Sequence, residues 1–247
     1  MGKGKKAAKT AAKADRDVTH EAARRDDGPV LRAAGKLTEL ADQPPLIALS
    51  AGTILVGLLS RRRPIARTGS RMLASHLLAT AVKTVLKSSI DRTRPARALK
   101  HGYHAGKGDG ADDPSLNSFP SGHTAGAVAV AEAIAAGHGR AAIPARLAAA
   151  GVAALQPSRG KHYVSDVLAG AVIGLAAERL SRALLDRVEA AVERRLTPSA
   201  PRSSSAFPDC GCRAGRGARG RPPGRAAAGH RTCHSCWRCC RHRPASP

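Results

Sequence analysis

Five apolar stretches rich in alanine occupy most of the middle of the chain and limit the folds open to it. Only 2% of the residues are aromatic, so a large soluble core would have to be built from alanine, leucine and valine. Close packing through small residues is typical of helices in membranes, and Gly170 and Gly174 form one such pair. The stretches cover about residues 46–60, 71–90, 123–138, 141–156 and 163–182.

None of these stretches is a strong signal for a bilayer-spanning helix, because a span needs about twenty apolar residues. His76, Lys83 and Glu132 interrupt two of them. Ionisable residues inside spans usually face a bundle interior or a polar cavity. The sequence therefore predicts an all-α protein, a membrane-embedded bundle of about five to six helices with disordered tails. A soluble, alanine-rich helical bundle is the alternative.

The segments outside the stretches suggest the domain organisation. Residues 1–27 are rich in lysine and alanine and are expected to form a disordered basic tail without a signal peptide. Residues 28–45 have the apolar spacing of an interfacial helix or a weak first span. The three sequence motifs described below all fall in the predicted helical bundle, residues 46–196. Residues 197–247 are rich in Arg, Pro and Cys and are expected to be disordered.

Two groups of residues raise the alternative of a metal site. In the C-terminal tail the residue types, cysteine and histidine, suit zinc. The cysteines do not form two regularly spaced pairs, however, and we prefer a disordered appendage. That group is Cys233, His234, Cys236, Cys239 and Cys240. For residues 97–118 we prefer, over a metal site, a solvated loop that covers the site formed by the motifs described below. The second group is His101, His104, Asp109, Asp112 and Asp113.

The net charge of +23 predicts an anionic partner. Anionic lipid headgroups and nucleic acid both fit such an excess of basic side chains. Two tyrosines and one tryptophan leave little aromatic surface for base stacking. We therefore expect a membrane partner and no specific nucleic acid; the sequence leaves the oligomeric state open.

A first motif, Lys87-x6-Arg94-Pro95, supplies cations. If the segment is helical, Lys87 and Arg94 lie two turns apart on roughly one face, and Pro95 ends the helix. An arginine grips a phosphoryl group with two hydrogen bonds, and a lysine adds a point charge. A basic helix end at a membrane surface is the ordinary alternative.

A second motif, Phe119-Pro120-Ser121-Gly122-His123, has the pattern of a turn that enters a helix. Ser121 can cap such a helix, whose first N–H groups bind anions readily. Gly122 allows a ligand to approach the backbone, and His123 can give a proton to a leaving oxygen. The alternative is a capped helix with a solvent-facing histidine.

A third motif, Arg159-x2-His162-x3-Asp166, has the spacing of a helix face. A carboxylate four residues from a histidine can bond one ring nitrogen and leave the other free to attack. A surface His–Asp pair is the alternative.

In this order, the three motifs resemble those of the type 2 phosphatidic acid phosphatase superfamily, membrane lipid-phosphate phosphatases related to vanadium haloperoxidases. The resemblance covers about residues 45–185. It implies that His162 is the nucleophile that forms a phosphohistidine, that His123 protonates the leaving group and that Asp166 orients the nucleophile. It also implies a phosphate-binding set and no metal or other cofactor. That set is Lys87, Arg94, Ser121 and Gly122.

One position departs from the family pattern. The family usually carries Ser-Arg with the arginine six residues before the nucleophile, where this chain has Gln156. The nearest Ser-Arg pair ends at Arg159, three residues before His162. We expect Arg159 to bind the phosphate instead. Otherwise the site is one cation short, and the loss of such a contact can cost about a hundredfold in rate.

The charge distribution predicts an orientation. Alternating helix directions bring all three motifs to one face and the other basic clusters to the opposite face. Because cytoplasmic loops are rich in lysine and arginine, we expect a multi-pass protein of the cell inner membrane with its site facing the periplasm. The basic clusters are Arg61, Arg62, Arg63, Arg67, Arg179, Arg182 and Arg187.

These observations favour hydrolysis of a lipid phosphomonoester or diphosphate through a phosphohistidine. Undecaprenyl diphosphate, phosphatidic acid and phosphatidylglycerol phosphate all fit, and the sequence does not choose among them. Two alternatives stay open: a soluble vanadate-dependent haloperoxidase, and a catalytically weak or inactive relative that binds anionic lipid.

Overall fold

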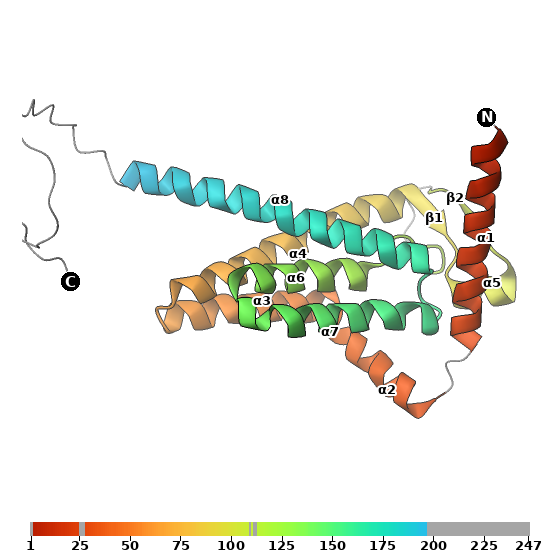
Figure 1. Ribbon diagram of the computed structural model, residues 1–247, viewed down its shortest axis with the longest axis horizontal. Helices are drawn as coiled ribbons and strands as arrows, with labels where there is room; N and C mark the ends of the chain where they lie inside the picture. The colour runs from red at the N-terminus through yellow and green to blue at the C-terminus, as the bar shows by residue number, and fades with distance from the viewer. Residues whose placement is uncertain (1, 25–27, 109, 111–112, 197–247) are drawn as a thin grey trace, which may run out of the picture. The chain divides into compact units, whose positions relative to one another are not determined.

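The computed structural model describes residues 2–24, 28–108, 110 and 113–196 (Figure 1). The predicted all-α class is confirmed, with eight α-helices in these residues rather than five to six, and one small two-stranded antiparallel sheet. The expected tail 197–247, with its cysteines, and the loop residues Asp109 and Asp112 lie outside them. The elements are α1 (Gly2–Arg24), α2 (Pro29–Leu37), the 3-10 turn η1 (Thr38–Ala41), α3 (Gln43–Leu59), α4 (Arg63–Ser89), β1 (Ile90–Arg92), α5 (Pro95–His101), β2 (Ala105–Lys107), α6 (Gly122–Gly137), α7 (Gly139–Ser158) and α8 (Val164–Leu196).

Five long helices form a bundle, and each contains most of one of the apolar stretches. Helix α6 packs against α4, α7 and α8, and α4 also packs against α3 and α8. The long helices run side by side in Figure 1. Glu132, which interrupts the stretch in α6, binds Arg146 of α7 through two hydrogen bonds of 2.7 Å.

Small side chains allow the bundle helices to approach closely. Ala79, Ala125, Ala129 and Ala177 form a buried cluster between α4, α6 and α8. A Cβ atom on Gly174 would lie 2.6 Å from the carbonyl oxygen of Ala125. Helices α6 and α8 therefore pack backbone against backbone, and this contact holds the start of α6 beside the start of α8.

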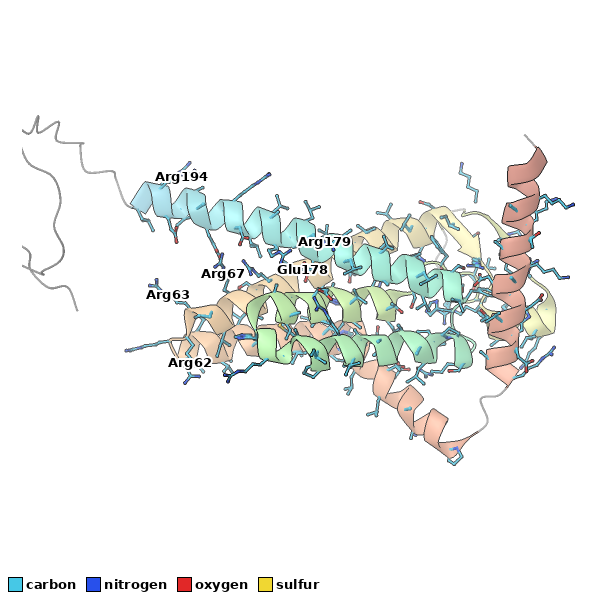
Figure 2. The ribbon with its side chains drawn as sticks, in the orientation of Figure 1. Arg62, Arg63, Arg67, Glu178, Arg179 and Arg194 are labelled. Carbon is cyan, nitrogen blue, oxygen red and sulfur yellow. The ribbon has the colours of Figure 1, made fainter. Side chains whose placement is uncertain are left out.

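The outer surface of the bundle carries many exposed apolar side chains. Among the described residues, no single helix is both long and apolar enough to cross a bilayer, but Ala33–Ala41 and Gln43–Leu59, bent by 58°, meet that test as a pair. Figure 2 shows Arg62, Arg63 and Arg67 at the end of the bundle opposite α1. The exposed apolar side chains include Leu55, Val56, Leu58, Leu59, Leu77, Val85, Ile143, Leu147, Leu168, Val172 and Leu180.

The N-terminal segment differs from its expected disorder, because residues 2–24 form helix α1, which crosses the end of the bundle (Figure 1). Alanine and lysine have high helix propensity, but such a helix is marginal without tertiary contacts. Polar side chains of α1 supply these contacts: Asp15 and Thr19 accept hydrogen bonds from the start of α8. Residues 28–45, expected as an interfacial helix or a weak span, form α2, η1 and the first turn of α3.

Candidate active site

A polar cavity of about 240 Å³ lies where α4 ends and α6 begins. Both histidines of the motifs line this one cavity. Of the sequence-predicted residues, Lys87, Arg94, Gly122, His123 and His162 line the cavity. The other lining residues are Ala41, Asp42, Gln43, His76, Thr80, Lys83 and Lys161.

The start of α6 brings backbone and imidazole to the cavity wall. Ser121 is the N-cap of α6, and its hydroxyl accepts from the N–H of Thr124, as the sequence predicts. The N–H of Ser121 donates to the carbonyl of Asp166, which ties α6 to α8. Because the next N–H groups have no partner within the helix, this end of α6 favours an anion. His123 lies in the first turn, with Nε2 3.9 Å from a carboxylate oxygen of Glu39.

The two cations of the first motif reach the cavity by a different route from the one expected. Helix α4 ends at Ser89, and Pro95 begins α5 rather than ending a helix. Proline suits the first position of a helix and makes the residue before it extended, so Arg94 has φ −65° and ψ 147°. Lys87 donates to the carbonyl of Asn117 at 3.2 Å.

Arg94 is partly buried, and burial lowers the pKa of its guanidinium, because a charge is less stable away from water. Among the described residues, no carboxylate lies within ion-pair distance of Arg94. A buried cation without a counter-charge favours the binding of an anionic ligand.

His162 lies in the loop before α8 and is 3% exposed. Its Nδ1 lies 2.6 Å from the carbonyl oxygen of Ser118, which can only accept, so Nδ1 carries the proton. Burial, together with the charges of Lys87 and Arg94, lowers the pKa of His162 to about 3. The ring is therefore neutral at physiological pH, with the lone pair on Nε2.

Asp166 does not bond the imidazole, contrary to the expectation from helical spacing. His162 precedes α8 instead of lying in it, and its Nδ1 is 4.0 Å from the Asp166 carboxylate. That buried carboxylate accepts from the hydroxyl of Ser118 at 2.6 Å and from the N–H of Tyr163 at 2.9 Å. Asp166 therefore orients the ring indirectly, by holding the residues that contact it.

Arg159 does not line the cavity. Its guanidinium donates to the hydroxyl of Thr38 at 2.5 Å and to Glu39 at 3.0 Å. Lys161 lines the cavity instead, and its ammonium donates to the same Glu39 oxygen at 2.9 Å. Gln156, at the position where the family usually has arginine, is fully buried and donates to the carbonyl of Val152 at 3.1 Å.

Several cavity residues are absent from the three motifs. His76 and Lys83 lie seven positions apart, two turns of α4, and they interrupt an apolar stretch. This pattern predicted that they face either the bundle interior or a polar cavity, without deciding between the two. Lys161 lacked any such signal. Gly122 faces Lys83, whose Cδ would lie 2.7 Å from a Cβ at position 122.

Glu39, Asp42 and His123 are the described residues that come nearest to a metal site, with one ligand-type atom of each within 4.8 Å of the others. The Glu39 carboxylate already binds Arg159 and Lys161. The cavity beside it is lined with cations, which repel a metal ion, and we assign no metal here. These cations are Lys83, Lys87, Arg94 and Lys161.

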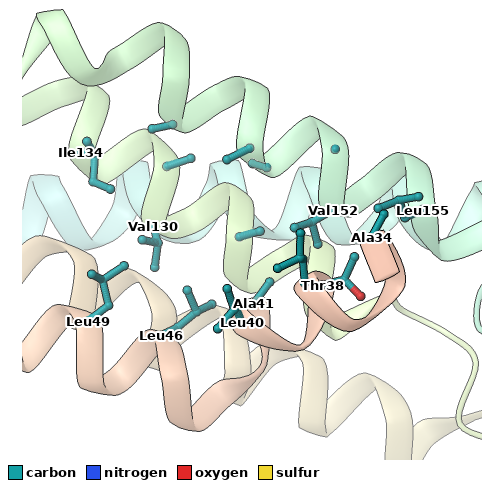
Figure 3. Close-up of a pocket in the computed structure, with 17 residues that line it drawn as sticks. Ala34, Thr38, Leu40, Ala41, Leu46, Leu49, Val130, Ile134, Val152 and Leu155 are labelled. Carbon is teal, nitrogen blue, oxygen red and sulfur yellow. The ribbon is translucent and has the colours of Figure 1, made fainter. Parts of the chain in front are cut away.

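An apolar groove of about 450 Å³ adjoins the polar cavity (Figure 3). Leu46, Val130 and Val152 are among its walls, which come from α2, η1, α3, α6 and α7. Ala41 lines both the groove and the polar cavity. The volume of the groove is within the usual range for ligand sites, roughly 300–1,000 Å³.

We expect the ring of His162 to remain neutral as the pH falls from 7 to 5, because its pKa is lowered to about 3. Between pH 6.5 and 3 the unfolded chain binds a proton that the folded chain does not, so acidification through this range destabilises the fold. Spectra of the ¹⁵N-histidine-labelled protein in detergent, with His162→Ala to assign the signal, measure the titration. A midpoint above pH 6 contradicts the described burial.

The chain matches the family model of the PAP2 superfamily over residues 69–188. No curated protein sequence matches the chain. Two solved structures share its fold. LpxE of Aquifex aeolicus has 20% sequence identity and a TM-score of 0.51, and the match covers 67% of this chain and 92% of that one.

The second solved structure is that of a transmembrane PAP2-type phosphatidylglycerolphosphate phosphatase from Bacillus subtilis. It has 21% identity and a TM-score of 0.55, with 72% of this chain and 88% of that chain covered. The family match contains Lys87, Arg94, His123, His162 and Asp166.

Proposed function

From the match to the PAP2 superfamily over residues 69–188, we propose that the chain is a phosphatase and that it hydrolyses a phosphomonoester or diphosphate of a membrane lipid. One observation carries this proposal: the two histidines share a cation-lined cavity that adjoins an apolar groove at Ala41. A cavity of this polarity suits a phosphoryl group, and the groove suits a hydrocarbon chain attached to it.

The reaction begins with binding of the phosphoryl group to Lys87, Arg94 and the first N–H groups of α6. The Nε2 lone pair of His162 attacks phosphorus, and the bond from phosphorus to the leaving oxygen breaks. His123 gives a proton to that oxygen, so the lipid leaves as an alcohol or as a monophosphate. The carbonyl of Ser118 stabilises the positive charge that develops on the His162 ring.

The second step regenerates the enzyme. Water attacks phosphorus of the phosphohistidine, and His123, now neutral, takes a proton from the water. The bond between phosphorus and Nε2 breaks, inorganic phosphate forms, and the electron pair returns to Nε2. The cations balance the charge on the phosphoryl oxygens in both steps, and removal of one such contact typically costs about 10²–10³ in rate.

We also propose that α3, α4, α6, α7 and α8 cross the cell inner membrane. The exposed leucine and valine side chains on the outside of the bundle support this placement. Arginines lie at the end opposite α1, where the positive-inside rule places the cytoplasm. The cavity then faces the periplasm, and the lipid phosphate reaches it from the membrane surface.

The test is phosphate release by the purified protein in detergent micelles. Phosphatidic acid, phosphatidylglycerol phosphate and undecaprenyl diphosphate are supplied separately, with and without vanadate and a chelator. We expect release from at least one lipid, inhibition by vanadate and no effect of the chelator. Equal rates with a short water-soluble phosphate ester contradict a role for the apolar groove.

The geometry also predicts which of two basic residues close to His162 in the sequence binds the phosphoryl group. We expect Lys161→Ala to lower kcat/KM by about 10–100-fold, because Lys161 lines the cavity. Arg159→Ala is expected to cost about fivefold or less, the value of a partly exposed ion pair. Steady-state rates at several lipid concentrations measure both. The reverse order means that Arg159 binds the phosphate, as the sequence predicts.

A further inference from the structure

Helix α1 contacts the segment that carries His162 through one carboxylate and one hydroxyl. The Asp15 carboxylate accepts from the N–H of Ser165 at 3.0 Å and from the hydroxyl of Ser165 at 2.6 Å. Thr19, four residues further along α1, accepts from the N–H of Val164 at 3.3 Å. The side chain of Asp15 is 13% exposed, and Thr19 is fully buried.

These bonds cap α8 from outside its own sequence. The first N–H groups of a helix have no intrahelical partner, and α8 begins at Val164. Asp15 and Thr19 satisfy two of these groups, and a carboxylate at this end of a helix is also favoured by the helix dipole. The capping contacts begin two residues after His162, so they fix the end of its loop.

A second connection runs from Asp15 through Arg92, which is 11% exposed. One nitrogen of the Arg92 guanidinium donates to Asp15 at 2.9 Å, and another donates to Asp166 at 2.5 Å. Burial raises the pKa of Asp15, but bonds from Ser165 and Arg92 outweigh it and lower that pKa. Arg92 thus lies between two carboxyl groups, one on α1 and one on α8.

The connection continues from Asp166 to the imidazole. Asp166 accepts from the hydroxyl of Ser118, and the carbonyl of Ser118 accepts from Nδ1 of His162. Each bond in this series is 2.5–2.9 Å long. Asp15, Arg92, Asp166, Ser118 and His162 therefore form one continuous chain of polar contacts.

Aromatic packing supports the same segment. Tyr163, the neighbour of His162, is fully buried. Its ring lies under the Arg92 guanidinium at 4.1 Å and 6.1 Å from the ring of His20 on α1. A guanidinium above a tyrosine ring is attracted to the ring face, so Arg92 is held by the ring as well as by two carboxylates.

We propose that α1 is a working part of the active site and that Asp15 is a positioning residue, which fixes the His162 loop through Arg92 and the start of α8. This inference rests on the proposed role of His162 as nucleophile. Without Asp15, Arg92 loses one of its two carboxylates and α8 loses a cap, so the ring of His162 samples orientations away from the phosphorus. A misplacement of about 1 Å can cost about 10² in rate.

The first test replaces Asp15 by asparagine in the full chain. We expect kcat to fall about 10–100-fold with KM changed less than about threefold, because Asp15 lies outside the cavity and acts on orientation rather than on binding. Asp15→Glu, which keeps the charge, is expected to retain more activity than Asp15→Asn. Asp17→Asn is the matched control: it removes the same charge from an exposed position of α1 and leaves kcat unchanged.

A double-mutant cycle tests whether Asp15 acts through Arg92. In the Arg92→Gln background, Asp15→Asn should lower kcat further by less than about threefold, because the ion pair between Asp15 and Arg92 is already lost. Full additivity of the two losses contradicts the bridge. A rise in KM with kcat unchanged overturns the proposal in favour of a lid that controls substrate access.

Hydrogen exchange tests the cap without any measurement of activity. We expect the amides of Val164 and Ser165 to be protected in the wild type and to exchange faster in Asp15→Ala and Thr19→Val, but not in Asp17→Ala. Unchanged exchange in both variants overturns the proposal. If the wild-type protein hydrolyses no lipid phosphate but the exchange differs as expected, the proposed function fails and the α1 contact stands.

Discussion

Replacing His162 by alanine is expected to reduce phosphate release at least about 10³-fold, because the variant loses the proposed nucleophile, which forms the covalent intermediate. The ring is held by the carbonyl of Ser118 with its Nε2 lone pair unprotonated. The truncation also leaves a space of imidazole size. Added imidazole should therefore restore part of the rate in the variant and none in the wild type.

The matched control is His101→Ala, which removes an exposed histidine at the end of α5 and should leave the rate unchanged. Brief reaction with ³²P-labelled substrate, followed by quenching in alkali, should trap a labelled wild-type protein and an unlabelled His162→Ala. Label on the variant, or full activity in it, removes His162 from the nucleophile role.

Replacing Arg94 by alanine has the second largest expected effect, a loss of about 10²–10³ in kcat/KM. Arg94 lines the cavity, and burial lowers the pKa of its guanidinium. A guanidinium can form two hydrogen bonds with a phosphoryl group, and they strengthen as charge develops on its oxygens. Lysine at this position should recover only part of the loss, because it supplies charge without the planar fork.

Arg97→Ala is the control for Arg94, since Arg97 is exposed on α5 one turn further on. Steady-state rates and vanadate inhibition should be measured on the same preparations. We expect the inhibition constant for vanadate to rise in Arg94→Ala along with the loss of rate. A loss of rate with unchanged vanadate binding shows that Arg94 supports the fold rather than the phosphoryl group.

The bundle was predictable from the sequence because its signal is local. Each apolar stretch becomes one helix, since alanine and leucine favour helices and the small residues that allow close packing are visible in the sequence. Helix α1 was not predictable, because its partners are polar side chains of distant segments. Pro95 was misinterpreted because proline both ends helices and begins them, and its position alone does not distinguish the two.

Five of the cavity residues were predictable because the motifs concentrate chemistry at helix ends, whereas the other seven are not among the motif residues. The sequence singled out Arg159 and gave no signal for Lys161, although it is Lys161 that lines the cavity, because a turn separates the two residues. Gly160 has a φ of +60°, a conformation that glycine adopts readily, and this turn directs Arg159 toward η1 while Lys161 reaches the cavity. The direct bond expected from Asp166 to the imidazole is not formed, because His162 lies just outside the helix whose spacing was assumed.

Ala41 presents only a methyl group where the polar cavity meets the apolar groove. Under the proposed function, a substrate whose phosphate is joined directly to its hydrocarbon chain can occupy the polar cavity and the apolar groove at once. A substrate with a sugar or a long polar spacer between the two parts could fill only one of them. A bulkier side chain at this position would thus change which lipids are accepted, according to the length of the link between the phosphate and the hydrocarbon chain.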